Sequence, residues 1–233
     1  MATLDPRLLA ASQMIIPRSA VADIGTDHGQ LPIYLLAAGI SPRVIATEWG
    51  DSPYRRACDN IRHSPCSGSI EVRQGYGLEP LQPAEVKTVV IMGMGGDLVA
   101  DILGRDWLHS ASFERVVLQP MSRPVTVRRI LAARGWDLLE ERVVRLRNRF
   151  FILMSYCPGS RPYRLTPLQE QVGPHILRSR GSAELAYLSY CRSRFKNLAD
   201  SLALSSLVAT RPKHNLYQSM CQELEDIIND KHG

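Results

Sequence analysis

Acidic residues and glycines alternate at every second position in one short segment of the chain, as Asp23, Gly25, Asp27 and Gly29. An apolar run ends just before Gly25, and a helical pattern begins soon after the last glycine. This order predicts a buried strand, a tight turn and the start of a helix, which is the geometry of a loop that holds a nucleotide-type ligand. Carboxylates beside the glycines suit a ligand that carries an ammonium group.

The spacing of these residues separates two classes of ligand. A dinucleotide loop follows G-x-G-x-x-G, because a pyrophosphate needs glycines and backbone N–H groups. This chain instead has an acidic-x-Gly-x-x-x-Gly pattern, which is typical of enzymes that bind S-adenosylmethionine, a sulfonium amino acid without a phosphate. We therefore expect S-adenosylmethionine as the cofactor. The expected contacts in this loop are Asp23, Gly25, Thr26, Asp27 and His28. An ordinary turn with a helix cap is the alternative.

Further candidates for cofactor contacts follow the second and third predicted strands. Glu48 closes the second strand, where a carboxylate can accept hydrogen bonds from both hydroxyls of a ribose; a surface glutamate is the alternative. Trp49 can stack on an adenine or simply pack. Gly75 and Tyr76 follow the third strand, where glycine permits close backbone approach and tyrosine offers an aromatic face. Glycines also simply make turns, so this signal is weak by itself.

Gly93, Met94, Gly95 and Gly96 follow the fourth predicted strand. We predict that this loop contributes to both the cofactor site, through Gly93, and the catalytic site, where its backbone faces the methyl acceptor. A structural turn is the alternative. Gln119 and Pro120, at the end of the fifth strand, are expected to form the other wall. Asp27 is the candidate for orienting or accepting a proton from the acceptor.

The predicted elements alternate between strands and helices. The strands are 21–24, 44–48, 70–74, 86–92 and 115–119, and the helices are 8–16, 31–38, 53–62, 97–103 and 123–134. This alternation indicates a doubly wound parallel sheet. Residues 136–144 and 150–156 flank an Arg-Leu-Arg-Asn turn and predict an antiparallel hairpin at the sheet edge. Such a layout is usual for the Rossmann-like fold of class I methyltransferases, an α/β fold.

The chain changes character after a Pro- and Gly-containing linker at 157–162. Apolar residues then recur at spacings of three and four in two stretches separated by Arg211-Pro212, which predicts an antiparallel helical hairpin resembling a short coiled coil. We expect two domains, a cofactor-binding domain over 1–160 and a C-terminal helical hairpin over 161–233.

Charge and composition bound the partners. The 233 residues carry a net charge of +5, and the stretch 142–196 alone holds eleven Lys and Arg against two acids, a net +9. A local basic block suggests a polyanionic partner such as RNA. Predicted phosphate contacts are Arg145, Arg147, Arg149, Arg178, Arg180, Arg192, Arg194 and Lys196. We expect a cytoplasmic protein without a metal and away from membranes. The five cysteines lack C-x-x-C spacing, and the sequence shows no metal-ligand spacing, no signal peptide and no long apolar run.

Four short segments together resemble a known family. The segment 23–28, Asp-Ile-Gly-Thr-Asp-His, is followed by Leu31-Pro32, by Gly93-Met94-Gly95-Gly96 and by Leu118-Gln119-Pro120. In this order they resemble the bacterial tRNA adenine-N1 methyltransferases that modify adenine 22, and the similarity spans nearly the whole chain. The family usually has asparagine after Leu-Gln-Pro, where this chain has Met121.

The resemblance implies a class I methyltransferase fold, S-adenosylmethionine as methyl donor and a tRNA substrate bound partly by the helical hairpin. It implies a methionine-end site at Asp23, Gly25, Asp27 and His28, a ribose contact at Glu48, and adenine contacts at Gly75 and Tyr76. A monomer or weak dimer is expected. The alternatives are a methyltransferase for another RNA, a protein or a small molecule, a nicotinamide dehydrogenase, and a non-catalytic RNA-binding module.

Overall fold

The computed structural model describes residues 4–204 and 210–232 of the chain. It divides into two compact units, with the boundary between Arg164 and Leu165. Each unit is described by itself below. Among the described residues, no helix combines the length and apolar character needed to cross a membrane.

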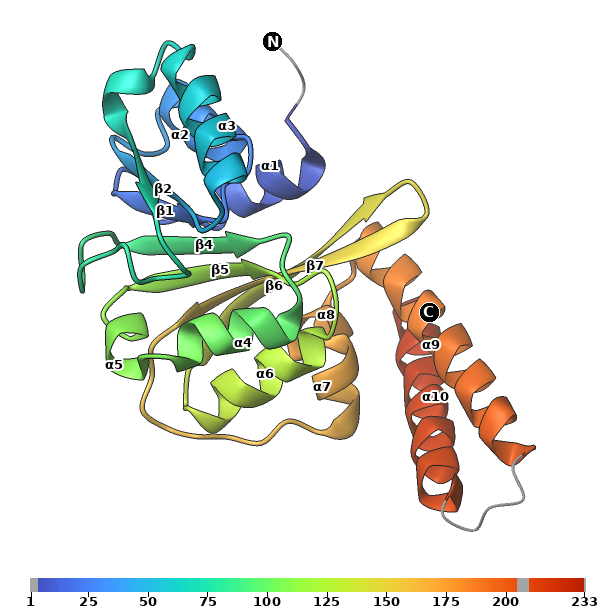
Figure 1. Ribbon diagram of the computed structural model, residues 1–233. Helices are drawn as coiled ribbons and strands as arrows, with labels where there is room; N and C mark the ends of the chain where they lie inside the picture. The colour runs from blue at the N-terminus through green and yellow to red at the C-terminus, as the bar shows by residue number, and fades with distance from the viewer. Residues whose placement is uncertain (1–3, 205–209, 233) are drawn as a thin grey trace. The chain divides into compact units, whose positions relative to one another are not determined.

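A twisted sheet organises the first unit (Figure 1). Its strands are β1 (Val21–Ile24), β2 (Val44–Glu48), β3 (Ile70–Gln74), β4 (Thr88–Met92), β5 (Arg115–Gln119), β6 (Asp137–Leu146) and β7 (Arg149–Cys157). The described residues form one seven-stranded sheet in the order β3-β2-β1-β4-β5-β7-β6. The first five strands are parallel, and β7 pairs antiparallel with both β5 and β6. Strands β2 and β3 are added on one side of β1, and β4 and β5 on the other side. Ligands bind in such folds at this change in strand order, between β1 and β4.

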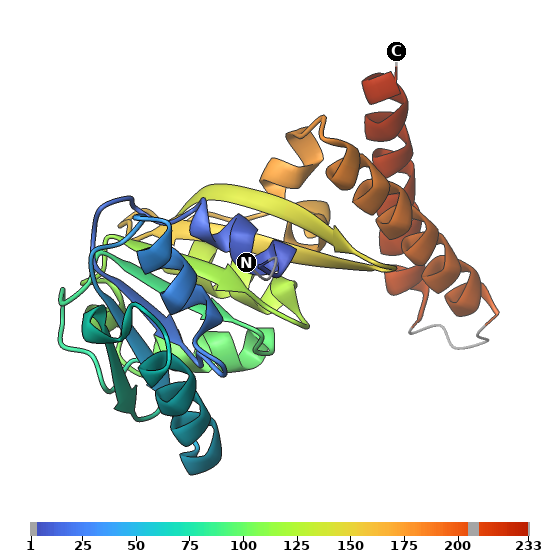
Figure 2. The same ribbon diagram turned by 90° about the horizontal axis from the view of Figure 1, so that it is seen from above.

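Helices cover both faces of the sheet. They are α1 (Pro6–Ser12), α2 (Gln30–Ala37), α3 (Asp51–Arg62), α4 (Gly96–Gly104), α5 (Trp107–Ser110) and α6 (Pro124–Ala133), with a 3-10 turn at Ser67–Ser69. Helices α1 and α2 lie over one face (Figure 2). There, Ala11 and Met14 from the α1 region and Leu31 and Leu35 from α2 pack on buried strand residues. Helices α4 and α6 pack against each other on the other face (Figure 1). Coverage on both sides explains why β1 and β2 are buried along their whole length.

The structure confirms the predicted fold class and corrects several boundaries. Strand β4 begins at Thr88 rather than Val86, because the N–H of Lys87 bonds to the Ala20 carbonyl, outside the ladder of paired strands. The hairpin strands β6 and β7 are longer than predicted and leave only Arg147-Asn148 as the turn, with Arg147 at φ +54°. Arg145 therefore lies on a strand, paired with Phe150, and not in a loop.

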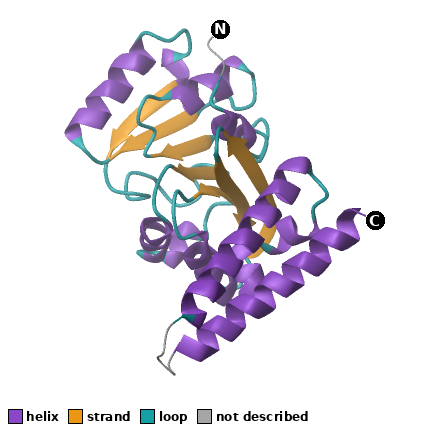
Figure 3. Ribbon diagram, turned by 90° about the vertical axis from the view of Figure 1, so that its right-hand side faces the viewer, coloured by secondary structure: helices purple, strands orange, loops and turns teal. Residues whose placement is uncertain are grey.

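The second unit is helical. It contains α7 (Pro167–Val172), α8 (Pro174–Arg178), α9 (Ser182–Ala203) and α10 (Arg211–His232). The two long helices run antiparallel, side by side (Figure 3). Their seam buries Leu188, Cys191 and Phe195 of α9 against Met220 and Leu224 of α10, largely along the predicted apolar stripes. Pro212 sits in the first turn of α10, where its missing N–H costs nothing.

Candidate active site

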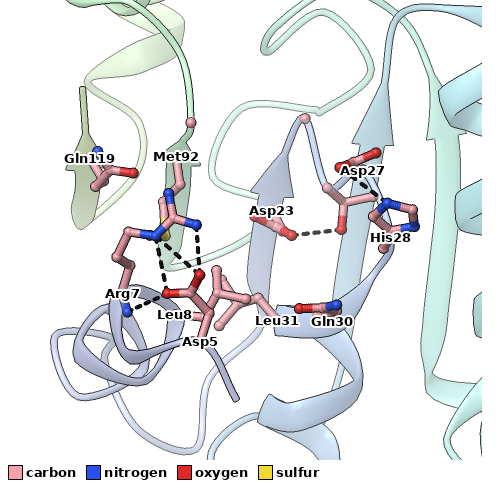
Figure 4. Close-up of a pocket in the computed structure, with 13 residues that line it drawn as sticks. Asp5, Arg7, Leu8, Asp23, Asp27, His28, Gln30, Leu31, Met92 and Gln119 are labelled. Carbon is pink, nitrogen blue, oxygen red and sulfur yellow. Dashed lines mark hydrogen bonds and ion pairs between the residues drawn. The ribbon is translucent and has the colours of Figure 1, made fainter. Parts of the chain in front are cut away.

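Two hollows lie at the carboxyl ends of the parallel strands and share Gly25. The first hollow, of about 200 Å³, is lined by Asp5, Arg7, Leu8, Asp23, Gly25, Thr26, Asp27, His28, Gln30, Leu31, Met92, Gly93 and Gln119 (Figure 4). The second hollow, of about 310 Å³, is lined by Ile24, Gly25, Thr47, Glu48, Trp49, Gly50, Pro53, Gly75, Tyr76, Gly77, Met94, Leu98 and Ile102. The first is framed by acidic residues, and the lining of the second is largely apolar.

The loop after β1 depends on left-handed backbone at alternating positions. Gly25, Asp27 and Gly29 have φ values of +72°, +52° and +67°. The N–H groups of Gly25 and Thr26 both donate to the Thr47 carbonyl, at 2.9 and 3.1 Å, so the loop is tied to the end of β2. Glycine is favoured at position 25 by its positive φ, and a Cβ atom there would push aside the flexible Cε end of Met94.

Asp23 is the buried carboxylate of the site. Its residue is only 5% exposed, and it accepts a 2.6 Å hydrogen bond from the Thr26 hydroxyl. Burial raises the pKa of Asp23 to about 6, with the Thr26 hydrogen bond opposing the shift and nearby Glu48 adding to it. Because burial makes the ionised carboxylate unfavourable by itself, a cation that binds beside Asp23 would stabilise its charged form.

Glu48 holds the loop from the other side. Its Oε1 accepts a hydrogen bond from the backbone N–H of Asp27 at 2.5 Å. Burial raises the pKa of Glu48, and the hydrogen bond from Asp27 works against that shift. The carboxylate lines the second hollow beside Trp49. It therefore opens onto the second hollow and also stabilises the loop, and its contact with a ribose stays a prediction.

Aromatic side chains wall the second hollow. Trp49 and Tyr76 meet edge to face, with ring centroids 5.7 Å apart. The Tyr76 hydroxyl donates to Asp101 at 2.7 Å, and the Arg105 guanidinium lies 4.0 Å from the tyrosine ring centroid. Tyr76 is therefore held in place, whereas Trp49 is 71% exposed and stands at the rim. An apolar hollow with an aromatic wall and an acidic end suits a nucleoside.

This combination of an acidic glycine loop and paired hollows lies on a fold shared with known proteins. The family described as "Methyltransferase domain" matches residues 4–154. The chain belongs to that family.

Relatives and solved structures agree with this assignment. The tRNA (adenine(22)-N(1))-methyltransferase of Bacillus subtilis is 36% identical over 140 residues, which are 59% of this chain and 58% of that enzyme. The matched segment thus spans less than two thirds of the curated relative. The crystal structure of the B. subtilis m1A22 tRNA methyltransferase TrmK superposes with a TM-score of 0.85 at 24% identity, covering 98% of this chain and 100% of that one. TrmK of M. capricolum, in complex with S-adenosylhomocysteine, superposes with a TM-score of 0.78 at 20% identity over 97% and 98% of the two chains. These findings confirm the predicted fold and the predicted family resemblance.

Within this methyltransferase fold, the four residues of the glycine loop after β4 take different places. Gly93 lines the first hollow. Met94 instead turns its side chain against Gly25 and lines the second hollow. Gly95 precedes α4, and Gly96 begins it and donates its N–H to the Ser122 carbonyl at 2.8 Å. Neither Gly95 nor Gly96 is among the lining residues of these two hollows; both join the loop to the segment after β5.

Asp27 and His28 lie at the mouth of the first hollow. The Asp27 side chain is 61% exposed and approaches the His28 ring at 3.5 Å (Figure 4). The Arg56 guanidinium also lies 3.5 Å from Asp27. Asp27 is therefore solvated at the rim of the first hollow, whereas Asp23 is buried.

The N-terminal segment contributes a wall that sequence reasoning did not place in the site. Asp5 caps α1 by accepting from the Arg7 N–H and also pairs with the Arg7 guanidinium at 2.6 Å, which lowers the pKa of Asp5. The Arg7 guanidinium lies over the Phe151 ring, 4.8 Å from its centroid. The cap Asp-Pro-Arg was the available signal for a helix start, but only the fold brings it to the hollow.

Basic residues of the β6–β7 hairpin lie close to this N-terminal wall. The Arg149 guanidinium is 5.3 Å from the centroid of the same Phe151 ring, and that of Arg145 is 5.7 Å from the Phe150 centroid. Arg145, Arg147 and Arg149 are exposed. A basic strip therefore runs from the first hollow toward the tip of the hairpin.

The predicted phosphate contacts of the helical unit differ from one another. Arg192 pairs with Glu225 at 3.1 Å, and Arg180 lies 3.8 Å from Asp230, so acids of α10 face both guanidiniums. Arg194 and Lys196 are exposed on α9, and Arg178 is exposed at the end of α8. In the described part of the chain, no group of three or more His, Cys, Asp or Glu side chains is arranged to hold a metal ion.

Proposed function

We propose that this protein transfers the methyl group of S-adenosylmethionine to N1 of adenine 22 in tRNA. The observation that carries the proposal is the acidic loop Asp23–Gly29 between two hollows on a methyltransferase-family fold. The identity of 36% to a B. subtilis enzyme with that activity supports the substrate. The proposal includes tRNA as partner, no metal, and a monomer or weak dimer acting in the cytoplasm.

The residues present fit the cofactor. Asp23 supplies a buried carboxylate for the ammonium group, and Glu48 a carboxylate at the ribose position. The hollow between Trp49, Tyr76 and Ile102 fits an adenine ring, and Gly25 leaves room for the chain that joins the two ends. When bound, S-adenosylmethionine supplies an electrophilic methyl group on a sulfonium sulfur.

The protein's contribution to the reaction is mainly positioning. A ring nitrogen with a lone pair needs no activated nucleophile from the protein, so an in-line approach at contact distance is the requirement. Gly93 lines the first hollow and presents backbone without side-chain bulk to an incoming base. Methyl transfer to N1 leaves the adenine ring with a positive charge. We propose that Asp27, exposed at the rim, orients the N6 amino group of that ring or accepts a proton from it.

Methyl transfer to unmodified tRNA tests the proposal. Purified protein, labelled S-adenosylmethionine and a tRNA transcript with adenine at position 22 should give label in the RNA. Primer extension should then stop next to adenine 22, because a methyl group on N1 blocks Watson–Crick pairing. A transcript with guanine at this position serves as the control. Label without a stop at adenine 22 would assign the enzyme another target, and no label would contradict the proposal.

Replacing the three hairpin arginines by glutamine should weaken tRNA binding. Arg145, Arg147 and Arg149 are exposed and begin next to the first hollow, where RNA must approach. Each lost phosphate contact lowers the slope of log affinity against log salt by about 0.7–0.9, so the triple variant should lose roughly 2 from that slope. Filter binding between low and moderate salt measures it, with Arg62→Gln on exposed α3 as the control. An unchanged slope would assign these arginines to solubility instead.

A further inference from the structure

One polar atom at the first hollow has no hydrogen-bond partner. Gln119, at the end of β5, is fully buried, and its side-chain Oε1 is without a partner among the described residues. Buried carbonyl oxygens in native proteins are nearly always paired, so an orphaned one calls for a ligand or a functional reason. Gln119 is also a lining residue of the first hollow.

The neighbouring side chains determine which atom of the Gln119 amide has no hydrogen-bond partner. Its Nε2 donates to Sδ of Met121 at 3.5 Å, and Met121 also accepts from the Arg7 guanidinium at 3.8 Å. A thioether is a weak acceptor and has no donor, so Met121 cannot satisfy Oε1. The amide oxygen points toward the Met92 side of the hollow (Figure 4).

The same atom lies beside the loop that faces the acceptor. Met92 and Gln119 are register partners on β4 and β5, and the Gly93 N–H donates to the Gln119 carbonyl at 3.2 Å. Gly93 and Met92 line the first hollow together with Gln119. A donor entering the hollow beside Gly93 therefore meets an unpaired acceptor at its floor.

We propose that Oε1 of Gln119 accepts a hydrogen bond from the N6 amino group of the target adenine and makes Gln119 a specificity-determining residue. This inference rests on the proposed function. On adenine, the N6 donor is adjacent to N1, so a bond to N6–H also turns N1 toward the methyl donor. Guanine carries a carbonyl oxygen at the same ring position, and two facing acceptors repel each other.

Access to Oε1 requires only flexible groups to move. Met92 and Met121 are unbranched, and thioether side chains rearrange readily. Met121 is 36% exposed, and Arg7 stands at the edge of the hollow with its guanidinium partly solvated. A base that enters can displace these groups, whereas the backbone of β5 stays in the sheet.

A functional-group exchange tests the bond. Wild type and Gln119→Met, a variant of similar volume without the acceptor, are assayed on two transcripts that carry adenine or unsubstituted purine at position 22. The wild type should prefer adenine, and the ratio of kcat/KM values for adenine over purine should fall about tenfold in Gln119→Met. The difference in intrinsic reactivity between the two bases cancels in this comparison. Gln119→Glu, which keeps an acceptor oxygen, should retain most of the preference.

Two further measurements separate this role from a structural one. The affinity for S-adenosylmethionine and the melting temperature of Gln119→Met should stay close to wild type, because cofactor contacts and core volume are preserved. An adenine-to-purine ratio that changes less than about twofold in Gln119→Met would overturn the inference while leaving the proposed function intact. A wild-type enzyme that does not methylate adenine 22 would overturn both.

Discussion

Asp23→Asn should lower the affinity for S-adenosylmethionine roughly a hundredfold and leave the protein at least as stable as before. Loss of one charged partner at a buried site costs about 3 kcal/mol of binding free energy. Asn keeps an oxygen that can accept the 2.6 Å hydrogen bond from Thr26. Isothermal titration calorimetry measures the affinity, and thermal unfolding of the ligand-free protein measures the stability.

The expected gain in stability follows from the raised pKa of Asp23, about 6 in the fold against 3.8 for an unperturbed aspartate. The folded state holds this proton more tightly than the unfolded state does. The associated stability is therefore fully present below pH 4 and is lost as the pH rises through about 6. At pH 7 the ionised carboxylate costs on the order of 2–3 kcal/mol, which Asn removes.

Cofactor affinity should show the opposite pH dependence. Below about pH 6 the Asp23 carboxyl of the free protein is protonated, so wild-type affinity should fall by up to about tenfold per pH unit. Asp23→Asn should lack this decline. Asp59→Asn, a change at an exposed carboxylate of α3, is the matched control and should bind like wild type. If Asp23→Asn binds S-adenosylmethionine as tightly as Asp59→Asn does, the ammonium contact lies elsewhere.

Gly96→Ala should reduce both stability and activity. A Cβ atom on Gly96 would overlap the carbonyl oxygen of Arg123 and crowd that of Ser122, both backbone atoms that cannot turn aside. Helix α4 must then separate from the segment that leads into α6, and the 2.8 Å hydrogen bond from the Gly96 N–H to Ser122 lengthens. Overpacking of this kind costs about 1–3 kcal/mol, or roughly 2–12 °C in melting temperature for a chain of this size.

The Gly96→Ala rate should fall by more than the lost stability explains, even at temperatures where the variant stays folded. The loop that shifts includes Gly93, which lines the first hollow, and Met94, which lines the second. Differential scanning fluorimetry and initial rates on tRNA measure the two effects. Gly68→Ala provides the control, since a Cβ atom there meets nothing within 4 Å. A Gly96→Ala protein with the melting temperature and rate of Gly68→Ala would show that the α4 junction tolerates the extra carbon.

Local patterns were sufficient for most of the sheet. β1, β2, β3 and β5 coincide with the predicted ranges, because each is a short apolar or β-branched run ended by a turn or by glycine. The loop at Asp23–Gly29 was equally readable, since left-handed backbone at alternating positions demands residues such as glycine and aspartate. Three short helices, α5, α7 and α8, were missed. The caps of two of them are visible in the sequence: Asp106 caps α5, and Thr166 with Gln169 forms a capping box on α7.

The composition of the hollows could not be derived in the same way. Arg7 reaches Phe151 and Met121, more than a hundred residues away, only because α1 packs near β6 and β7. Charge patterning along the chain predicted Arg192 as a phosphate contact, but it could not show that Glu225 on the antiparallel helix pairs with this arginine. Such pairings depend on which elements become neighbours, and linear spacing carries no information about that.

Residue order alone specified the strands, the acidic glycine turn and the chemistry it suits, since strand burial and positive φ act within a few neighbouring positions. Packing of distant segments settled the rest. It turned Met94 against Gly25, brought Asp5 and Arg7 to the first hollow and left Oε1 of Gln119 without a partner. These outcomes depend on side-chain volume and hydrogen-bond partners supplied by other elements, which exist only once the sheet and its covering helices have assembled.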